Sequence, residues 1–131
     1  MNLSSPKCIA DIMATQLVTF TPDLNIHQAI HELVNKRISG APVVDAAGKL
    51  VGVLSKKDCL KIVYSTAYHQ DRGGPVSEYM STDVHTLDDT VDVAVAAEHF
   101  VHSTYRRFPV VRDGKLVGQV SRHDILKSLI D

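Results

Sequence analysis

Two short motifs combine a hydroxyl, a basic side chain and a carboxylate at one spacing. They are Ser55-Lys56-Lys57-Asp58 and Ser121-Arg122-His123-Asp124. Ser-x-x-Asp is typical of a capping box, in which each of the two side chains accepts a hydrogen bond from the other residue's N–H. The same place can attract an anion, because the first N–H groups of a helix are unpaired and the helix dipole is positive there.

The basic residues of these motifs favour a role for them in anion binding. A positive side chain on the first turn opposes the helix dipole, so helix stability gives no reason for Lys56 or Arg122 to stand there. Solvated surface charge is the alternative, and the sequence does not separate the two. Basic side chains beside free N–H groups would suit a phosphate group.

Histidine pairs are the other candidate cluster. His27 and His31 are four residues apart and His99 and His102 are three apart, spacings that let helical side chains share a metal. Surface histidines on an amphipathic helix are the more common case, so we predict no metal site. The sequence holds no H-E-x-x-H motif, no Walker loop and no G-x-G-x-x-G after a strand. The motifs therefore indicate binding without turnover, and we expect no enzyme activity.

The two capping motifs belong to an internal duplication. An offset of 67 pairs residues 11–44 with residues 78–111 without a gap, and an offset of 66 then pairs residues 48–61 with residues 114–127. Pro-Val-Val recurs at residues 42–44 and 109–111, and Gly-Lys-Leu-Val-Gly at residues 48–52 and 114–118. A repeat over this length predicts two structural units of one kind.

Each copy predicts the element order β-α-β-β-α. The extended segments are residues 17–20 and 84–87, and the helices that follow have Asn25 and Asp92 as N-caps. Two β-branched runs then form a hairpin, which in the second copy turns at Asp113-Gly114. Residues 11–13 and 77–80 are expected to be short helical lead-ins. The predicted apolar stripes are Ile26, Ile30, Leu33 and Val34 in the first copy and Val93, Ala96, Ala97, Phe100 and Val101 in the second.

Length and composition fit one globular domain made of two halves. The chain has 131 residues, of which 44% are hydrophobic and 22% charged. We assign residues 1–68 to a first repeat with its lead-in and residues 69–131 to a linker and second repeat. A half of this size buries little surface alone, so we predict an α/β (α+β) fold whose repeats pack through their sheets with pseudo-two-fold symmetry.

Charge and residue usage exclude several partners. The net charge is −1, and with four Tyr, three Phe and no Trp the chain is poorly suited to nucleic acid, so we expect no such partner. No apolar stretch reaches the roughly 18 residues needed to span a bilayer, and the N-terminus lacks a signal-peptide pattern. Cys8 and Cys59 are expected to be free thiols. We therefore expect a cytoplasmic protein without a membrane partner.

The ordered, duplicated elements resemble the cystathionine β-synthase (CBS) domain. The whole chain is similar to a tandem pair, or Bateman module, of the stand-alone type with no catalytic domain attached. The resemblance implies a regulatory sensor that binds AMP, ADP, ATP or a related adenosyl ligand in clefts between the repeats, with S-adenosylmethionine and NAD(H) as further candidates. It also implies a homodimer and an unidentified regulated protein, with no required cofactor. A constitutive dimerisation or interaction module with vestigial clefts is the alternative.

The resemblance also implies site residues. Asp58 and Asp124 would accept hydrogen bonds from the ribose hydroxyls, a role that a capping carboxylate can combine with its cap. Ordinary core is the alternative for Ile38, Ala41 and Phe108. The predicted ligand-binding residues are Thr19, Ile38, Gly40, Ala41, Ser55, Lys56, Asp58, Thr86, Arg106, Arg107, Phe108, Ser121, Arg122 and Asp124.

The two predicted clefts differ in charge. Arg106-Arg107 stands where the first copy has Ser39-Gly40, which adds fixed positive charge near Arg122. We therefore predict that the cleft with Asp124 prefers a phosphorylated ligand. The cleft with Asp58 is predicted to be weaker or to take a less anionic ligand.

Overall fold

The computed structural model describes residues 7–69 and 73–130, so part of the linker, residues 70–72, lies outside the described chain. No helix within the described ranges is long and apolar enough to cross a membrane. The elements in chain order are η1 (Ile9–Asp11), α1 (Ile26–Asn35), β1 (Gly40–Val44), β2 (Leu50–Ser55), α2 (Lys56–His69), η2 (Val76–Glu78), β3 (Leu87–Asp88), α3 (Val93–Val101), β4 (Arg107–Arg112), β5 (Lys115–Ser121) and α4 (Arg122–Ser128). The mixed α/β class and the order of helix, hairpin and closing helix in each repeat are those predicted, whereas the strand predicted at residues 17–20 does not form and the one predicted at 84–87 is only Leu87–Asp88.

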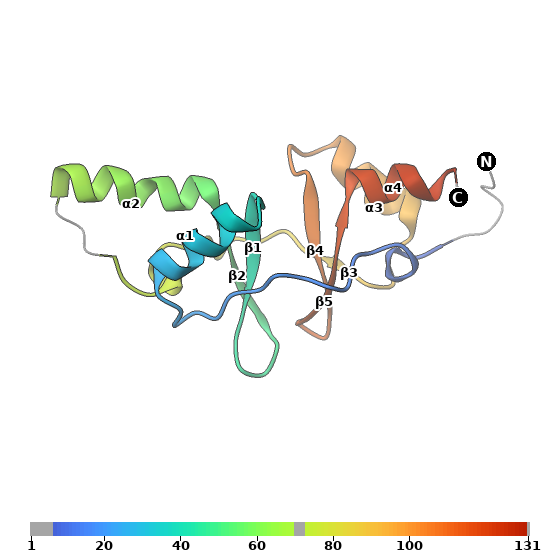
Figure 1. Ribbon diagram of the computed structural model, residues 1–131. Coiled ribbons are helices and arrows are strands. Elements are labelled where there is room, and N and C mark those ends of the chain that lie inside the picture. The colour runs from blue at the N-terminus through green and yellow to red at the C-terminus, as the bar shows by residue number, and fades with distance from the viewer. Residues whose placement is uncertain (1–6, 70–72, 131) are drawn as a thin grey trace. The chain divides into compact units, whose positions relative to one another are not determined.

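The chain divides into two compact units whose boundaries differ from those of the sequence repeats. The first unit is continuous, Val18–Val84, whereas the second unit joins the chain up to Leu17 to the chain from His85 onward. Each unit contains the hairpin and helices of one repeat together with the lead-in of the other (Figure 1). The mutual packing of the two repeats through their sheets stays a prediction.

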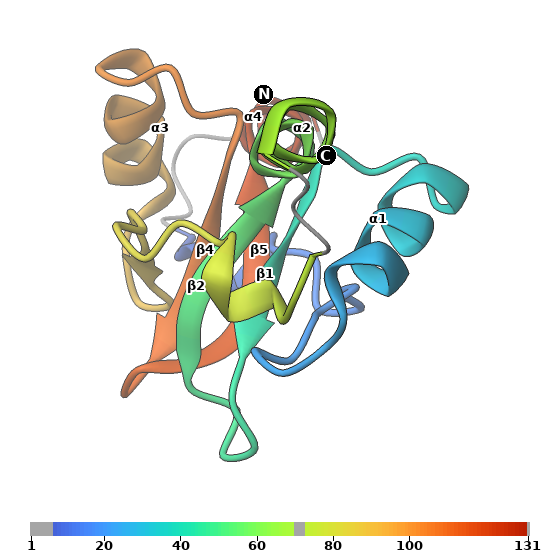
Figure 2. The same cartoon turned by 90° about the vertical axis from the view of Figure 1, so that its left-hand side faces the viewer.

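The first unit is built on the antiparallel pair β1 and β2, with Gly40 opposite Ser55. Phe20 pairs with Val43 in parallel, so the segment before α1 runs beside β1 as a single bridge rather than a full strand. Asn25 caps α1 as predicted, because its side chain accepts a hydrogen bond from the His27 N–H at 2.8 Å. Helix α1 lies alongside the hairpin in Figure 2. The buried core comprises Phe20, Ile26, Ala29, Leu33, Ala41, Val43, Leu54, Cys59, Ile62 and Val76.

The second unit has three strands in the order β3-β4-β5, with β3 parallel to β4 and β5 antiparallel to it. Asp113 and Gly114 both have positive φ, 53° and 79°, as the predicted two-residue hairpin turn requires. Asp92 caps α3 by accepting from the Ala94 N–H at 2.8 Å. The buried core comprises Ile9, Leu87, Ala96, Phe100, Phe108, Val110, Val120 and Ile125.

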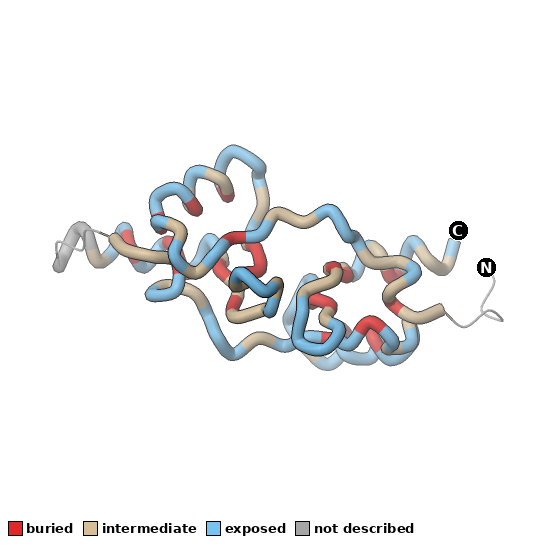
Figure 3. The backbone as a smooth tube through the Cα atoms, turned by 90° about the horizontal axis from the view of Figure 1, so that it is seen from below, coloured by how far each residue is buried: buried red, intermediate tan, exposed pale blue. Residues whose placement is uncertain are grey.

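The predicted apolar stripes are wrong at one matching position in each copy. Val34 and Val101 are 60% and 78% exposed, although both were expected to face the core. The buried stripe instead includes Ala29 in α1. Val34 lies about a quarter turn from the centre of that stripe, since successive helical residues are about 100° apart. In both units the buried positions, red in Figure 3, fall on the strands and on the inner side of the helices.

The two lead-ins occupy equivalent places, each on the unit of the other repeat. Ile9 and Val76 are both fully buried, within 3-10 helices that begin slightly earlier than predicted. The Ile9 N–H donates to Val91 O at 2.8 Å, and the Val76 N–H donates to Leu24 O at the same distance. Each repeat is therefore completed by a segment from outside its own sequence copy.

Glycines in the second strand of each hairpin allow the lead-ins to approach. A Cβ at Gly118 would lie 2.8 Å from Ala14 O, and one at Gly52 would lie 2.8 Å from Ser81 O. The same residues pair as isolated bridges, Ala14 with Gln119 and Ser81 with Val53. Any larger residue would push backbone against backbone at these places.

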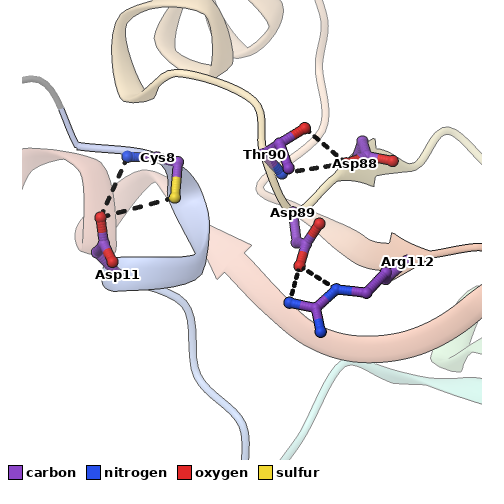
Figure 4. A network of polar contacts seen from close by, with 6 residues as sticks. All are labelled: Cys8, Asp11, Asp88, Asp89, Thr90 and Arg112. Atoms are coloured by element: carbon purple, nitrogen blue, oxygen red, sulfur yellow. Dashed lines mark hydrogen bonds and ion pairs between the residues drawn. The ribbon is translucent and has the colours of Figure 1, made fainter.

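An ion pair between a buried carboxylate and an exposed arginine occurs at the end of the second unit's sheet (Figure 4). Asp89 is 3% exposed, and its carboxylate accepts a hydrogen bond from Arg112 Nε at 2.7 Å and forms an ion pair with Nη2. This carboxylate raises the pKa of Arg112. The Thr90 N–H and hydroxyl both donate to Asp88, which lowers the pKa of that carboxyl group. The Ala10 N–H donates to Asp89 O at 3.2 Å, so the N-terminal lead-in is hydrogen-bonded to the residue that forms this ion pair.

The two free cysteines differ in their expected reactivity. Cys59 on α2 is 7% exposed, and burial together with the negative charge of Asp58 raises the pKa of its thiol. Because the thiolate is the reactive form, we expect iodoacetamide to modify Cys59 at least about tenfold more slowly than the partly exposed Cys8 at neutral pH. Peptide mapping by mass spectrometry measures both rates, which should converge in urea. Equal rates in the folded protein would contradict this prediction.

Candidate functional site

Each unit brings most of its predicted site residues to one end of its sheet. Gly40, the first residue of β1, lies opposite Ser55, the last residue of β2. Helix α2 begins at the next residue, Lys56. The Lys56 N–H donates to Ser39 O at 2.8 Å, and the equivalent Arg122 N–H donates to Arg106 O at 3.2 Å. These bonds fasten the start of each closing helix to the segment before the first hairpin strand.

The predicted residues fall into two sets, one for each unit. The first site consists of Thr19, Ile38, Gly40, Ala41, Ser55, Lys56 and Asp58. The second site consists of Thr86, Arg106, Arg107, Phe108, Ser121, Arg122 and Asp124. Thr19 and Thr86 are exposed and immediately precede Phe20 and Leu87, which pair in parallel with the first hairpin strand of their unit.

Both helix starts form the predicted capping box. The Ser55 N–H donates to Asp58 Oδ2 at 2.9 Å, and the Asp58 N–H donates to Ser55 Oγ at 3.0 Å. The corresponding distances for Ser121 and Asp124 are 2.8 and 3.1 Å. Each cap occupies one carboxylate oxygen, so the other oxygen has acceptor capacity for a further donor.

The two capping carboxylates differ in their surroundings. Asp58 is 6% exposed, and its Oδ1 accepts a hydrogen bond from Lys61 Nζ at 3.4 Å. Asp124 is more exposed, and its Oδ1 accepts no hydrogen bond from the described residues. A donor arriving from solvent would compete with Lys61 at Asp58, whereas at Asp124 it would meet a carboxylate oxygen that lacks such a competitor.

Exposed arginines are found at the second site. The side chains of Arg106, Arg107 and Arg122 are all exposed around the start of α4, whereas the start of α2 has Lys56 and Lys57, with Lys61 paired with Asp58. Arg122 Nε donates to Tyr105 O at 3.1 Å, which leaves the rest of the guanidinium group to contact an anion. Guanidinium groups suit forked contacts to a phosphate, and the preference of the second site for a phosphorylated ligand stays a prediction.

Four of the predicted residues have structural roles in their own units. Ala41 and Phe108 are only 1% and 2% exposed and belong to the cores, the alternative given for them above. A Cβ at Gly40 would lie 2.9 Å from Leu54 O, so the absence of a side chain there serves the approach of β2. Ile38 is partly buried and packs against the first core. A contribution of these residues to binding stays a prediction.

An aromatic pair beside the second site was not singled out by the motifs. The Tyr105 ring lies 5.2 Å from the His85 ring and 5.4 Å from the Phe108 ring, measured between centroids. The signal that could have found it is the repeat alignment, because Val18 and Ile38 are the counterparts of His85 and Tyr105. Aromatic replacement of two aliphatic residues in one copy marks a difference between the copies.

The histidine pairs do not assemble a metal centre within the described chain. No group of three His, Cys, Asp or Glu side chains that could hold a metal ion occurs among the side chains that the structure describes, those of residues 7–65 and 73–130. His31 Nε2 is instead hydrogen-bonded to the side-chain nitrogen of Asn35 at 2.7 Å, and the His99 ring packs edge-on against Phe108.

Comparison with known proteins assigns the repeats. A family model of the CBS domain matches residues 9–65 and again residues 76–131. The chain belongs to the CBS domain family. Its two matches follow the internal duplication, so the protein contains a CBS pair, and the resemblance drawn from the sequence motifs is confirmed.

A curated relative places such a CBS pair within a larger enzyme. The chain is 35% identical over 121 residues to an A-adding tRNA nucleotidyltransferase of Aquifex aeolicus, covering 92% of this chain and 14% of the enzyme. The CBS pair is thus an accessory part of that enzyme, and the chain spans about one seventh of its length.

Solved structures with this fold include CBS pairs crystallised with adenosyl ligands. CBSX2 of Arabidopsis thaliana in complex with AMP is 28% identical with a TM-score of 0.82, over 94% of this chain and 96% of that one. The CBS domain pair of protein MJ0100, in complex with 5′-methylthioadenosine and S-adenosyl-L-methionine, is 26% identical with a TM-score of 0.74, over 95% and 97% of the chains.

Proposed function

We propose that this CBS pair binds an adenine nucleotide or related adenosyl ligand without turning it over, and that binding regulates a partner protein. The capping carboxylate at the start of each closing helix, with basic residues around it, is the observation that carries this proposal. A carboxylate oxygen not used by the cap can accept from a ribose hydroxyl, and the first turn with its cations can attract a phosphate. The AMP and S-adenosyl-L-methionine complexes of similar CBS pairs support it.

The differences between the two sites suggest a different preferred ligand for each. The second site has three exposed arginines and the more accessible carboxylate, which favours a phosphorylated ligand such as AMP, ADP or ATP there. At the first site, Lys61 already occupies part of the Asp58 carboxylate. That site is proposed to be weaker or to take a less anionic adenosyl compound.

A constitutive dimerisation module is the second candidate function. Apolar side chains are exposed at matching positions of the two repeats: Leu60 on α2 and Leu126 on α4 are 64% and 63% exposed, and Tyr64 on α2 and Ile130, in the turn after α4, are 62% and 83% exposed. Exposed apolar residues on a helix face favour a protein contact over solvent. Under this alternative the candidate sites are vestigial and the homodimer forms without ligand.

A thermal-shift screen with AMP, ADP, ATP, S-adenosylmethionine and NADH tests the proposal. A ligand at 100 times its dissociation constant should stabilise the folded chain by about 2.7 kcal/mol, which raises the melting midpoint by several degrees. Chromatography of the ATP sample should recover unhydrolysed ATP. The double variant Asp58→Ala/Asp124→Ala is the control and should lose the shift.

The same screen separates the two candidate functions. If no adenosyl compound shifts the midpoint while sedimentation shows a ligand-independent dimer, nucleotide binding is refuted and the interaction module is favoured. A shift that persists in the double variant would place the ligand away from the capping carboxylates.

A further inference from the structure

We propose that Lys61 masks the first site. Its ammonium group occupies the Asp58 oxygen that the ribose of an adenosyl ligand would use, so this site is restrained by one of the chain's own side chains rather than vestigial. The inference rests on the proposed binding of an adenosyl ligand. It adds the residue that sets the affinity and the ligand preference of one of the two sites.

The Asp58 carboxylate is shielded from solvent, and both of its oxygens have partners. Oδ2 accepts from the Ser55 N–H at 2.9 Å, which completes the helix cap, and Oδ1 accepts from Lys61 Nζ at 3.4 Å. The Asp58 side chain is 9% exposed, and a carboxylate withdrawn from water needs such partners. Loss of the cap would leave the start of α2 unpaired, so Oδ1 is the oxygen for which a ligand can compete.

The contact between Lys61 and Asp58 is weak enough for a ligand to displace. A charge-assisted hydrogen bond between a nitrogen and a carboxylate is usually about 2.7–2.9 Å long, and this one is 3.4 Å. The Lys61 side chain is 65% exposed, so its ammonium group can return to water at little cost. The two hydroxyls of a ribose offer two donors where the lysine offers one long bond. The mask therefore lowers the affinity of the first site by a modest factor and does not abolish binding.

The second repeat carries a lysine at the matching position without the mask. Lys127 is aligned with Lys61, yet no bond joins it to Asp124 among the described residues. Helix α4 has seven residues and Lys127 stands in its last turn, where the negative end of the helix dipole attracts a cation. Helix α2 has 14 residues, so Lys61 lies inside the helix and lacks that attraction. Masking is thus confined to the first site.

The experiment removes the ammonium group and keeps most of the aliphatic stem. In an Asp124→Ala background, which confines the measurement to the first site, Lys61→Met should tighten binding of 5′-methylthioadenosine by roughly two- to fivefold in calorimetry, the range expected for loss of one exposed ion pair. This probe has the base and the diol but no phosphate, so it reports on Asp58 alone. Lys61→Arg retains a cation beside Asp58 and should not tighten binding.

AMP gives a readout that a merely structural role would not move. Loss of the lysine leaves the Asp58 charge uncompensated, and this charge repels a phosphate group. AMP should therefore gain less affinity than 5′-methylthioadenosine, or lose affinity, whereas a loosened helix would change both affinities alike. Lys127→Met in an Asp58→Ala background is the matched control and should leave the affinity of the second site for 5′-methylthioadenosine unchanged.

The outcomes distinguish this inference from the function on which it rests. Three results overturn the masking role: no gain for 5′-methylthioadenosine in Lys61→Met, an equal gain for AMP, or no binding at the first site with or without Lys61. Binding of AMP by the wild-type chain would then leave the proposed function intact. Failure of both the wild-type chain and its Lys61→Met variant to bind any adenosyl compound overturns both proposals.

Discussion

Replacing Asp124 by alanine is expected to weaken binding of a phosphorylated adenine nucleotide by roughly 10- to 100-fold, since hydrogen bonds to a charged group contribute about 1.5–3 kcal/mol each. Asp124 keeps an oxygen that accepts nothing from the described residues, and exposed arginines surround its helix start. The matching Asp58→Ala change should cost less, because Asp58 is already paired with Lys61 and its site has no counterpart of Arg106 and Arg107. Titration calorimetry with ATP and AMP measures both losses.

Ser121→Ala is the matched control for the loss of the helix cap. It removes the hydroxyl that accepts the Asp124 N–H at 3.1 Å but keeps the carboxylate. We expect it to lower the free energy of unfolding by about 1 kcal/mol and, although Ser121 is itself a candidate site residue, to weaken nucleotide binding less than Asp124→Ala does, because the carboxylate stays in place. Equal affinity losses from Asp58→Ala and Asp124→Ala would refute the asymmetry of the two sites. A loss of affinity in Ser121→Ala as large as that in Asp124→Ala would show that the helix cap, and not the carboxylate's contact with the ligand, causes the loss.

Replacing Ile9 by alanine is expected to destabilise the second unit by about 2–5 kcal/mol, the usual cost of removing a fully buried isoleucine side chain. Ile9 is 0% exposed and packs in the core that contains Phe108, Val110 and Val120. Hydrogen exchange should therefore show the largest loss of protection in β4 and β5, although Ile9 belongs to the first repeat by sequence. Chemical denaturation measures the accompanying loss in free energy of unfolding.

Val76 provides the reciprocal control. It is also 0% exposed, but it packs in the first unit with Phe20 and Leu54. Val76→Ala should reduce exchange protection chiefly in β1 and β2, with a somewhat smaller loss of stability because fewer methylene groups are removed. Exchange changes that follow the sequence repeats, with Ile9→Ala loosening β1 and β2, would show that the lead-ins are not exchanged.

Local patterns predicted most of the elements because each depends on a few adjacent residues. Asn25 and Asp92 cap the helices that follow them, and Asp113-Gly114 makes the expected tight turn. The exchange of lead-ins could not be predicted from the sequence. An apolar residue such as Ile9 indicates that its side chain is buried, but it does not indicate which residues bury it. Val34 was wrongly predicted to face the core for a related reason. Helical spacing alone does not show which side of α1 is buried, and the buried side includes Ala29.

The features of the candidate sites that both repeats share were predictable from the sequence. Ser121 and Asp124 echo the first motif, and their cap follows from spacing alone. The contacts that make the sites different are not periodic: Lys61 reaches Asp58, yet no such bond joins Lys127 and Asp124 among the described residues. The ion pair of Asp89 with Arg112 is likewise confined to one copy, where the other has Pro22 and Asp45.

The exchanged lead-ins set an order of events during synthesis. The first unit, Val18–Val84, is continuous, so all of its core residues are available once residue 84 has left the ribosome. Ile9 is made before any of them but packs against Val120, more than a hundred residues later. At roughly 5–20 residues per second, this apolar segment waits on the order of 5–20 seconds for its partner. The segment around Ile9 is therefore made before the other residues of its core and can pack only after the last of them has been synthesised.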